Sequence, residues 1–308
     1  DGPFVDPRVF VPYADPQYKI LTGLKKFNPE QKIEWVEGIC NSSGSKMWVP
    51  VDLVFYTGQN PGNKRAIFYE ASSNGVATHF SKSVAVETAL YELVERDAFS
   101  VMWYTKKIPR RIPISSLPSG LKERVSHWEK LGYRVSLLDL TLDGPPVILT
   151  VIWSDQRTPA LFSGAGCRPK LLDALSRAFD EAEFMAMTWY RRKPKRHMLV
   201  SDIKSVDDHG LFYLEPKNLV HTKWLLETKH VESTTKDFSS DLINHLDPIV
   251  IDITPNGTNS GLTVVRVLSE KLMPINFGYG GEHRGHQRVK MLQLNWSMEY
   301  PSIPHFFA

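Results

Sequence analysis

The sequence predicts an α/β protein in which mixed sheets are covered by helices and arranged as two related lobes. Long stretches with apolar residues at helical spacing alternate with short runs rich in Val, Ile and Leu. A unit of helix, strand, turn and strand also occurs twice along the chain. The composition agrees, because 42% hydrophobic and 23% charged residues are ordinary for a globular protein, here of 308 residues.

Charge and cysteine content exclude several classes of protein. A formal net charge of +3, from 37 basic and 34 acidic residues, gives no indication of a nucleic-acid or membrane partner. No apolar run is long enough to span a bilayer and no secretory signal is present, so we expect a cytoplasmic protein. Cys40 and Cys167 are too few for a disulfide framework and are expected to be reduced. The chain begins with Asp1 rather than Met, which suggests a processed or excised chain with an upstream segment.

The first part of the chain gives the weakest pattern. Residues 1–45 mix Pro, charged and aromatic residues without a clear period, and we interpret them as an irregular segment with short strands. The apolar run Met47–Tyr56 predicts a strand, and Gln59–Gly62 predicts a turn after it. A second strand is expected to return over Ala66–Tyr69.

Three long helices are predicted after this region. The first runs over residues 84–104, directly after the compact turn Ser72–Gly75. The second covers residues 121–131 and is closed by Gly132. The third follows Pro169 and covers residues 171–190, where apolar residues again recur at helical spacing.

The repeated unit follows the second helix and recurs near the end of the chain. Its first copy has a strand over Val135–Thr141 and, after a polar turn, a strand over Val147–Trp153. Its second copy has strands over Ile249–Thr254 and Leu262–Leu268, and a short amphipathic helix precedes each copy. Residues 200–247 are rich in charged and small polar side chains, so we expect a surface excursion between the copies.

A stripe of charged residues on the first helix is the leading candidate for a functional site. Glu92, Glu95 and Arg96 are three or four residues apart and therefore share one helical face, although the surrounding sequence is apolar. Buried carboxylates need partners, and Mg²⁺ together with a phosphate would supply them. A simpler interpretation is an internal ion pair between Glu92 and Arg96, which many helices contain.

The third helix repeats the theme. Arg177, Asp180, Glu181 and Glu183 lie among apolar residues, and two such helices could enclose metal ions. The two stripes could equally pair with each other or face solvent. The turn Ser72–Gly75 suits a phosphate or ribose contact, but it is also an ordinary turn. Motifs for a P-loop, a dinucleotide fold, a zinc site or a catalytic Ser or Cys nucleophile are missing from the sequence.

These residues stand in an order that resembles YcaO-domain proteins. The resemblance rests on Ser73-Asn74-Gly75-Val-Ala, followed by Ala89-Leu-Tyr-Glu-Leu-Val-Glu-Arg-Asp-Ala98. It continues through Leu138–Thr141, Ala174–Ala182, Asp252–Thr254 and Val264–Val267. It therefore spans residues 45–308, which we take as one ATP-binding catalytic domain after the N-terminal segment.

The resemblance implies an ATP cleft in which glutamates from two helices hold magnesium ions. Carried over to this chain, the metal ligands are Glu92, Glu95, Glu181 and Glu183. The nucleotide-binding residues are Ser73, Asn74, Gly75, Arg96, Arg177, Arg266 and Arg284. The catalytic residues are Glu92, Glu95, Arg96, Glu181 and the C-terminal Ala308.

The resemblance also implies a reaction. Such proteins activate a peptide backbone amide by phosphorylation, most often to cyclise Cys, Ser or Thr into azolines in a ribosomally made precursor peptide. The implied partners are that peptide, a recognition subunit resembling a ubiquitin-activating enzyme and a flavin-dependent dehydrogenase, and a homodimer is also expected. Thioamide or amidine formation is an alternative, and so is a non-catalytic peptide-binding subunit. Two departures motivate these alternatives: Phe184 stands where the family has Gln or Glu, and the chain ends in His-Phe-Phe-Ala308 without the family's proline-rich tail.

Overall fold

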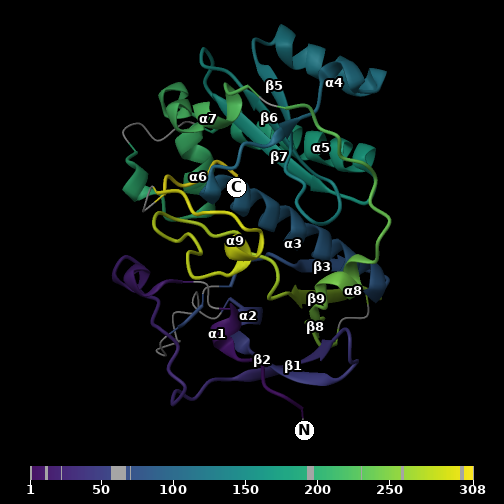
Figure 1. Ribbon diagram of the computed structural model, residues 1–308, viewed down its shortest axis with the longest axis vertical. Helices are drawn as coiled ribbons and strands as arrows, with labels where there is room; N and C mark the ends of the chain where they lie inside the picture. The colour runs from purple at the N-terminus through teal and green to yellow at the C-terminus, as the bar shows by residue number, and fades with distance from the viewer. Residues whose placement is uncertain are drawn as a thin grey trace. The chain divides into compact units, whose positions relative to one another are not determined.

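The computed structural model gives the arrangement of most of the chain. It describes residues 2–10, 13–21, 23–56, 67–69, 71–192, 198–229, 231–257, 260–298 and 302–307. The chain forms two compact units, each built around one sheet (Figure 1). The first unit consists of Asp1–Asp97, Ser240–Ile275 and His283–Leu294, and the second of Ala98–Ser239, Asn276–Glu282 and Asn295–Ala308. The predicted α/β class is confirmed.

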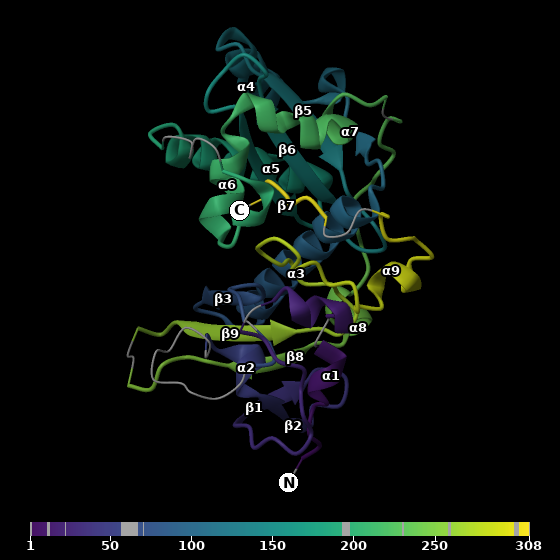
Figure 2. The same cartoon turned by 90° about the vertical axis from the view of Figure 1, so that its left-hand side faces the viewer.

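The first unit contains a five-stranded sheet in the order β2-β1-β8-β9-β3. Its strands are β1 (Trp35–Cys40), β2 (Lys46–Pro50), β3 (Val76–His79), β8 (Ile249–Asp252) and β9 (Thr263–Leu268). Every pairing in it is antiparallel. Hairpins join β1 to β2 and β8 to β9, whereas the pairs β1–β8 and β3–β9 join distant parts of the chain. Strands from distant parts of the chain meet in this sheet, since Ile39 of β1 pairs with Val250 of β8 (Figure 2).

Short helices surround this sheet. They are α1 (Pro7–Phe10), the 3-10 helix Asp15–Lys19, α2 (Val51–Val54), α8 (Leu242–Leu246) and α9 (Arg288–Met291). The unit also holds the first part of the long helix α3 (Lys82–Thr105). The core includes Val49, Leu53, Phe68 and Ile251, all at most 1% exposed.

The predicted strand Met47–Tyr56 is wrong after Pro50. Proline has no backbone N–H for the sheet, and the next residues form the helical turn α2. Of the predicted return strand, Ile67 makes only an isolated parallel bridge to Leu24. The predicted turn Gln59–Gly62 lies outside the described residues.

The second unit contains a four-stranded antiparallel sheet in the order β4-β5-β6-β7. Its strands are β4 (Arg110–Arg111), β5 (Arg134–Asp139), β6 (Val147–Trp153) and β7 (Leu161–Cys167). Its helices are α4 (Ser119–Lys130), α5 (Leu171–Trp189), α6 (Val206–Tyr213) and α7 (Lys223–Leu226), with 3-10 turns at Ile114–Ser116, Val200–Asp202 and Pro216–Thr222. Helix α5 packs directly on the backbone of β7, because a Cβ at Gly164 would collide with the Ala182 nitrogen (Figure 1). The mixed sheets that we expected are therefore two antiparallel ones.

The repeated unit is confirmed, down to its hydrogen bonds. Helix α4 precedes β5 and β6, and helix α8 precedes β8 and β9. In the first copy Asp139 Oδ1 accepts from the Thr141 N–H at 3.0 Å, and Thr141 Oγ1 accepts from the first N–H of β6 at 3.1 Å. Asp252 and Thr254 repeat both bonds at the end of β8, at 3.1 and 2.9 Å. The same Asp-x-Thr sequence therefore closes the same turn in both units.

The predicted surface excursion over residues 200–247 is wrong for α6. Residues Asp208–Tyr213 are buried, and His209 is 0% exposed. Among the described helices, none combines the length and the apolar character needed to cross a membrane.

Candidate functional site

The site predicted in the first unit begins at the turn before β3. Gly75 has a φ of +76°, and a Cβ there would press on the Val267 carbonyl oxygen, so only glycine fits without strain. Its N–H donates to Glu92 Oε2 at 3.1 Å, while its carbonyl accepts from the Val267 N–H at 2.8 Å. The turn and the acidic stripe of α3 are therefore joined, and one oxygen of Glu92 is held by the backbone.

Arg266 holds this turn through hydrogen bonds to backbone carbonyl oxygens. It is 1% exposed, and its Nη1 and Nη2 donate to the carbonyl oxygens of Ser72 at 2.6 Å and Leu53 at 3.1 Å. Burial lowers the pKa of Arg266, and the negative charge of Glu92 opposes that shift. The buried Nε of Arg266 has no hydrogen-bond partner among the described residues. Arg266 was predicted to bind the nucleotide, and its contacts give it a role in shaping the turn that would bind it.

The two polar side chains of the turn differ in exposure. Ser73 is exposed and can offer its hydroxyl to a ligand. Asn74 is 5% exposed, and its amide Nδ2 donates to the Ile275 carbonyl oxygen at 3.4 Å. The backbone N–H groups of Asn74, Gly75 and Val76 already donate within the protein, so the exposed hydroxyl of Ser73 is the accessible polar group of this turn.

Further along α3 the charged stripe continues. Glu95 is 7% exposed, and Arg96 Nε lies 3.8 Å from Glu95 Oε1. The next residue, Asp97, accepts from the Met273 N–H at 2.8 Å and from Arg288 Nη2 at 2.7 Å. Asp97 and Arg288 have side chains 1% and 5% exposed. The sequence prediction missed this buried pair, although Asp97 stood as one more acid within an apolar run.

The Asp97–Arg288 pair orders the segment that carries Arg284. His283 and His286 are buried on either side of Arg284, and burial lowers their pKa values to about 3 and about 4. His286 Nδ1 accepts from the Arg288 N–H at 3.1 Å. Arg284 is half-buried in this segment. The first unit therefore contains Glu92, Glu95 and their cationic neighbours on one connected framework.

In the second unit, α5 carries the other predicted ligands. Glu181 Oε2 accepts from the Ala165 N–H of β7 at 2.8 Å, an arrangement similar to that of Glu92 with Gly75. Arg177 is exposed, four residues before Glu181. Phe184 is 61% exposed.

Glu183 has other partners. Its Oε2 binds Arg124 Nη2 at 2.8 Å and its Oε1 accepts from Trp128 Nε1 at 3.0 Å. Asp180, four residues before Phe184 on α5, binds Arg124 at 2.9 Å. Both acids join α5 to α4 by sharing Arg124, and Glu183 is also fixed by Trp128. We therefore leave Glu183 out of the proposed metal ligands.

The C-terminal segment packs inside the second unit. Phe306 and Phe307 are at most 2% exposed, and both contact Phe99. Trp103 Nε1 donates to the Ile303 carbonyl oxygen at 2.8 Å. The predicted catalytic residue Ala308 lies outside the described residues.

The carboxylates fit magnesium that arrives with a nucleotide. Among the described residues, no three His, Cys, Asp or Glu side chains are grouped to hold an ion on their own. Mg²⁺ does not need such a group, since it takes one or two carboxylates together with phosphate oxygens and water. Glu92 and Glu181 are half-buried, and a backbone N–H orients each of them.

Comparison with solved structures defines the class of the fold. A heterocyclase in complex with substrate and cofactor matches with a TM-score of 0.72 at 19% identity, over 95% of this chain and 43% of that one. The YcaO protein from Methanopyrus kandleri bound with AMPPCP and Mg²⁺ matches with a TM-score of 0.61 at 18% identity, over 90% and 72%. The chain has the fold of these heterocyclase and YcaO proteins.

The sequence itself places the chain in a family. Residues 1–273 match the model of the YcaO cyclodehydratases, described as ATP- and Mg²⁺-binding. The chain belongs to the YcaO family, and the resemblance inferred from its motifs is confirmed. An uncharacterized protein in the tfuA 3′ region of Rhizobium leguminosarum bv. trifolii is 34% identical over 170 residues, which are 51% of this chain and 39% of that protein. The chain spans less than half the length of the curated relatives it matches.

Proposed function

We propose that this chain binds ATP and Mg²⁺ and uses them to phosphorylate a peptide backbone amide. The proposed outcome is cyclisation of Cys, Ser or Thr to an azoline in a ribosomally made precursor peptide. The observation that carries the proposal is the matched pair Glu92 and Glu181, each projecting from a long helix of a YcaO-family chain with one oxygen held by a backbone N–H. We keep residues 45–308 as the proposed catalytic domain and the cytoplasm as the proposed location.

The proposed roles follow from charge and position. Glu92, Glu95 and Glu181 would hold Mg²⁺, while the Ser73 hydroxyl would contact phosphate and the Gly75 N–H would keep Glu92 in place. Bound MgATP supplies the γ-phosphoryl group for the amide oxygen. Phosphoryl transfer depends mainly on positioning and charge neutralisation, which explains why the chain needs no nucleophile motif. Arg96, Arg177 and Arg284 are the cationic groups that would balance the phosphate charge.

The proposed reaction takes place at one amide of the peptide backbone. The Cys, Ser or Thr side chain loses its proton to solvent and adds to the preceding carbonyl carbon, which closes the ring, and the resulting oxyanion takes the phosphoryl group while ADP leaves. Phosphate then departs from that carbon, the amide nitrogen loses its proton, and the new C=N bond completes the azoline. The peptide and a recognition subunit resembling a ubiquitin-activating enzyme are the proposed partners. A flavin-dependent dehydrogenase acting on the azoline and a homodimer are proposed as well.

The exposed Phe184 favours a second candidate, a non-catalytic subunit that binds peptide. The acids nearest to Phe184 are bound to Arg124, so they do not replace a ligand at that position. Calorimetry separates the candidates, since the second predicts no Mg²⁺-dependent ATP binding.

The Glu92→Gln variant tests the leading proposal. We expect peptide-dependent release of ADP and phosphate by the complex with its partner subunit to fall by at least about a hundredfold, since a bound metal ion supplies several kcal/mol of charge stabilisation and Glu92 is one of its proposed ligands. Glu87→Gln is the matched control on the exposed face of α3 and should retain turnover. Full turnover in Glu92→Gln would refute the assignment. Mass spectrometry of the peptide identifies the product, because loss of water marks an azoline or closed amidine, and exchange of oxygen for sulfur marks a thioamide.

A further inference from the structure

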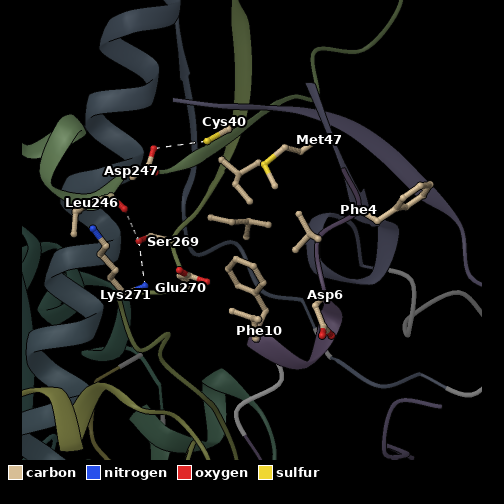
Figure 3. Close-up of a pocket in the computed structure, with 14 residues that line it drawn as sticks. Phe4, Asp6, Phe10, Cys40, Met47, Leu246, Asp247, Ser269, Glu270 and Lys271 are labelled. Carbon is tan, nitrogen blue, oxygen red and sulfur yellow. Dashed lines mark hydrogen bonds between the residues drawn. The ribbon is translucent and has the colours of Figure 1, made fainter. Parts of the chain in front are cut away.

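A cavity of about 250 Å³ lies in the first unit, apart from the predicted ATP-binding residues (Figure 3). The N-terminal segment that contains α1 forms one side of it, and the sheet with the residues after α8 and β9 forms the other. The lining is mainly apolar, with Phe10, Met47, Ile249 and Leu268 among its members. Its volume exceeds the roughly 150 Å³ of an apolar protein cavity that accepts benzene.

Apolar side chains also extend to the mouth of the cavity. Phe4 is 61% exposed and Val9 is 45% exposed, and both belong to the lining. Phe4 is held in place by an edge contact with Trp35, whose ring centroid is 4.8 Å away. The cavity therefore presents a continuous apolar surface from its floor to solvent, which favours an apolar occupant.

The rim of the cavity carries negative charge. Among the described residues, three carboxylates and one ammonium group line it, although the whole chain has a formal net charge of +3. Asp6 is balanced by Arg8 at 2.6 Å. Asp247 accepts from the Ser42 N–H at 2.8 Å, and Glu270 is exposed and forms no ion pair with any described residue.

Lys271 is the ammonium group among the described residues of the rim. Lys271 Nζ donates to the His245 carbonyl oxygen at 2.8 Å. The ammonium charge of Lys271 offsets that of Asp247, so the exposed Glu270 supplies the remaining negative charge beside the apolar floor. Figure 3 shows Asp247, Glu270 and Lys271 on the same side of the cavity. A cationic group next to an apolar one would complement this surface.

We propose that this cavity binds a peptide segment in which an apolar side chain stands next to a lysine or arginine. The apolar side chain lies against Leu268 and Met47, and the cationic group reaches Glu270 at the rim. Such a site would capture peptide independently of the ATP chemistry. Its occupancy is measured without nucleotide, so failure of this proposal and failure of the proposed reaction are separate results.

Cys40 provides a reporter inside the cavity. It belongs to the lining, and hydrogen bonds with Ser42 and Ser43 lower the pKa of its thiol, which increases the fraction of reactive thiolate. Cys167 is 0% exposed and serves as the unreactive internal control. The rate at which N-ethylmaleimide modifies Cys40, followed by intact-protein mass spectrometry, therefore reports access to the cavity.

The experiment compares acetyl-Leu-Arg-Phe-Arg-amide with acetyl-Leu-Glu-Phe-Glu-amide in the absence of nucleotide. We expect the basic peptide to slow modification of Cys40 in a saturable way and the acidic peptide to leave the rate unchanged. Glu270→Lys should weaken protection by the basic peptide roughly three- to fivefold, as expected for an exposed charge pair. Glu30→Lys, an exposed acid outside the lining, is the matched control and should protect like the natural chain.

A second pair of variants tests the apolar part. Met47→Trp should fill the cavity and abolish protection, whereas Met298→Trp, at a residue 99% exposed, should not. If Met47→Trp does not fold, the comparison of Glu270→Lys with Glu30→Lys still tests whether the basic peptide binds at the rim of the cavity. Equal protection by both peptides, or none by either up to their solubility limits, would overturn the proposal.

Discussion

Replacing Asp97 by Asn removes the negative charge that balances Arg288 in the first unit. The two side chains are 1% and 5% exposed and meet through Nε and Nη2 of Arg288 at 2.8 and 2.7 Å. Removing one partner of a buried ion pair leaves the other charge without compensation and costs about 3–5 kcal/mol. The Met273 N–H loses a carboxylate acceptor in the same change, which adds to the loss. We therefore expect Asp97→Asn to lower the free energy of unfolding by at least about 3 kcal/mol.

Urea denaturation measures this change, with unfolding followed by tryptophan fluorescence. The matched control is Glu37→Gln, which breaks the exposed ion pair with Lys46, where the side chains are 46% and 65% exposed. That control should cost no more than about 1 kcal/mol. The single variants Asp97→Ala and Arg288→Ala, together with the double variant Asp97→Ala/Arg288→Ala, form a double-mutant cycle. A coupling energy near zero in that cycle would mean that the ion pair does not act as a unit. A loss below about 1 kcal/mol in Asp97→Asn would refute the reasoning, because a buried Arg288 charge without its partner should cost about 3–5 kcal/mol.

Three further predictions concern the turn, helix α5 and the buried histidines. Gly75→Ala should destabilise the protein by more than Gly44→Ala and weaken ATP binding in calorimetry, because both glycines have a positive φ but only Gly75 has a carbonyl in the path of a Cβ. A milder effect at Gly75 than at Gly44 would contradict this. Glu183→Gln should lower the free energy of unfolding by about 1–3 kcal/mol, because it removes the ion pair with Arg124, and should leave ATP affinity unchanged. Glu181→Gln should weaken ATP binding. Equal losses of ATP affinity in the two variants would restore Glu183 as a metal ligand. Burial lowers the pKa of His209 to about 4, below its unfolded value near 6.5, so its contribution to stability is complete above pH 6.5 and is lost as the pH falls. His209 should contribute roughly 2 kcal/mol to the loss of stability between pH 7.5 and 5, and His283 and His286 add to the total. A stable His209→Gln variant should therefore lose roughly 2 kcal/mol less than the natural chain, as measured by urea denaturation at both pH values.

Local pattern predicted the long elements well. The helices at 82–105, 119–130 and 171–189 and the strands of both repeated units carry strong periodicity or long apolar runs, and the structure places all of them where expected. Strands β3 and β7 were not predicted, because neither has a long apolar run or a clear alternation of apolar and polar residues. β7 reads Leu-Phe-Ser-Gly-Ala-Gly-Cys, and its glycines, which weaken a strand in isolation, are needed because α5 lies directly on its backbone.

The site was predicted in part. The turn at Gly75 and the acid at Glu92 were both recognised, but the hydrogen bond that joins them across seventeen residues was not predicted. Charge pattern did not distinguish Glu181 from Glu183, because the two lie two positions apart on α5 and only the neighbouring elements decide their partners. Asp97 and Arg288 were not recognised as a pair because nothing in local sequence links residues on α3 and α9.

The pairing of β1 with β8 has a consequence for folding. The four-stranded sheet of the second unit uses only residues 110–167, so its hairpins can close while the chain is still being made. Strand β1 must wait for β8, and at roughly 5–20 residues per second the ribosome needs on the order of ten seconds or more to supply it. During that interval β1 exposes an open edge to other nascent chains. The hairpin β1–β2 is therefore the place where aggregation during expression should begin, and slower initiation or a bound chaperone should raise the yield of folded protein.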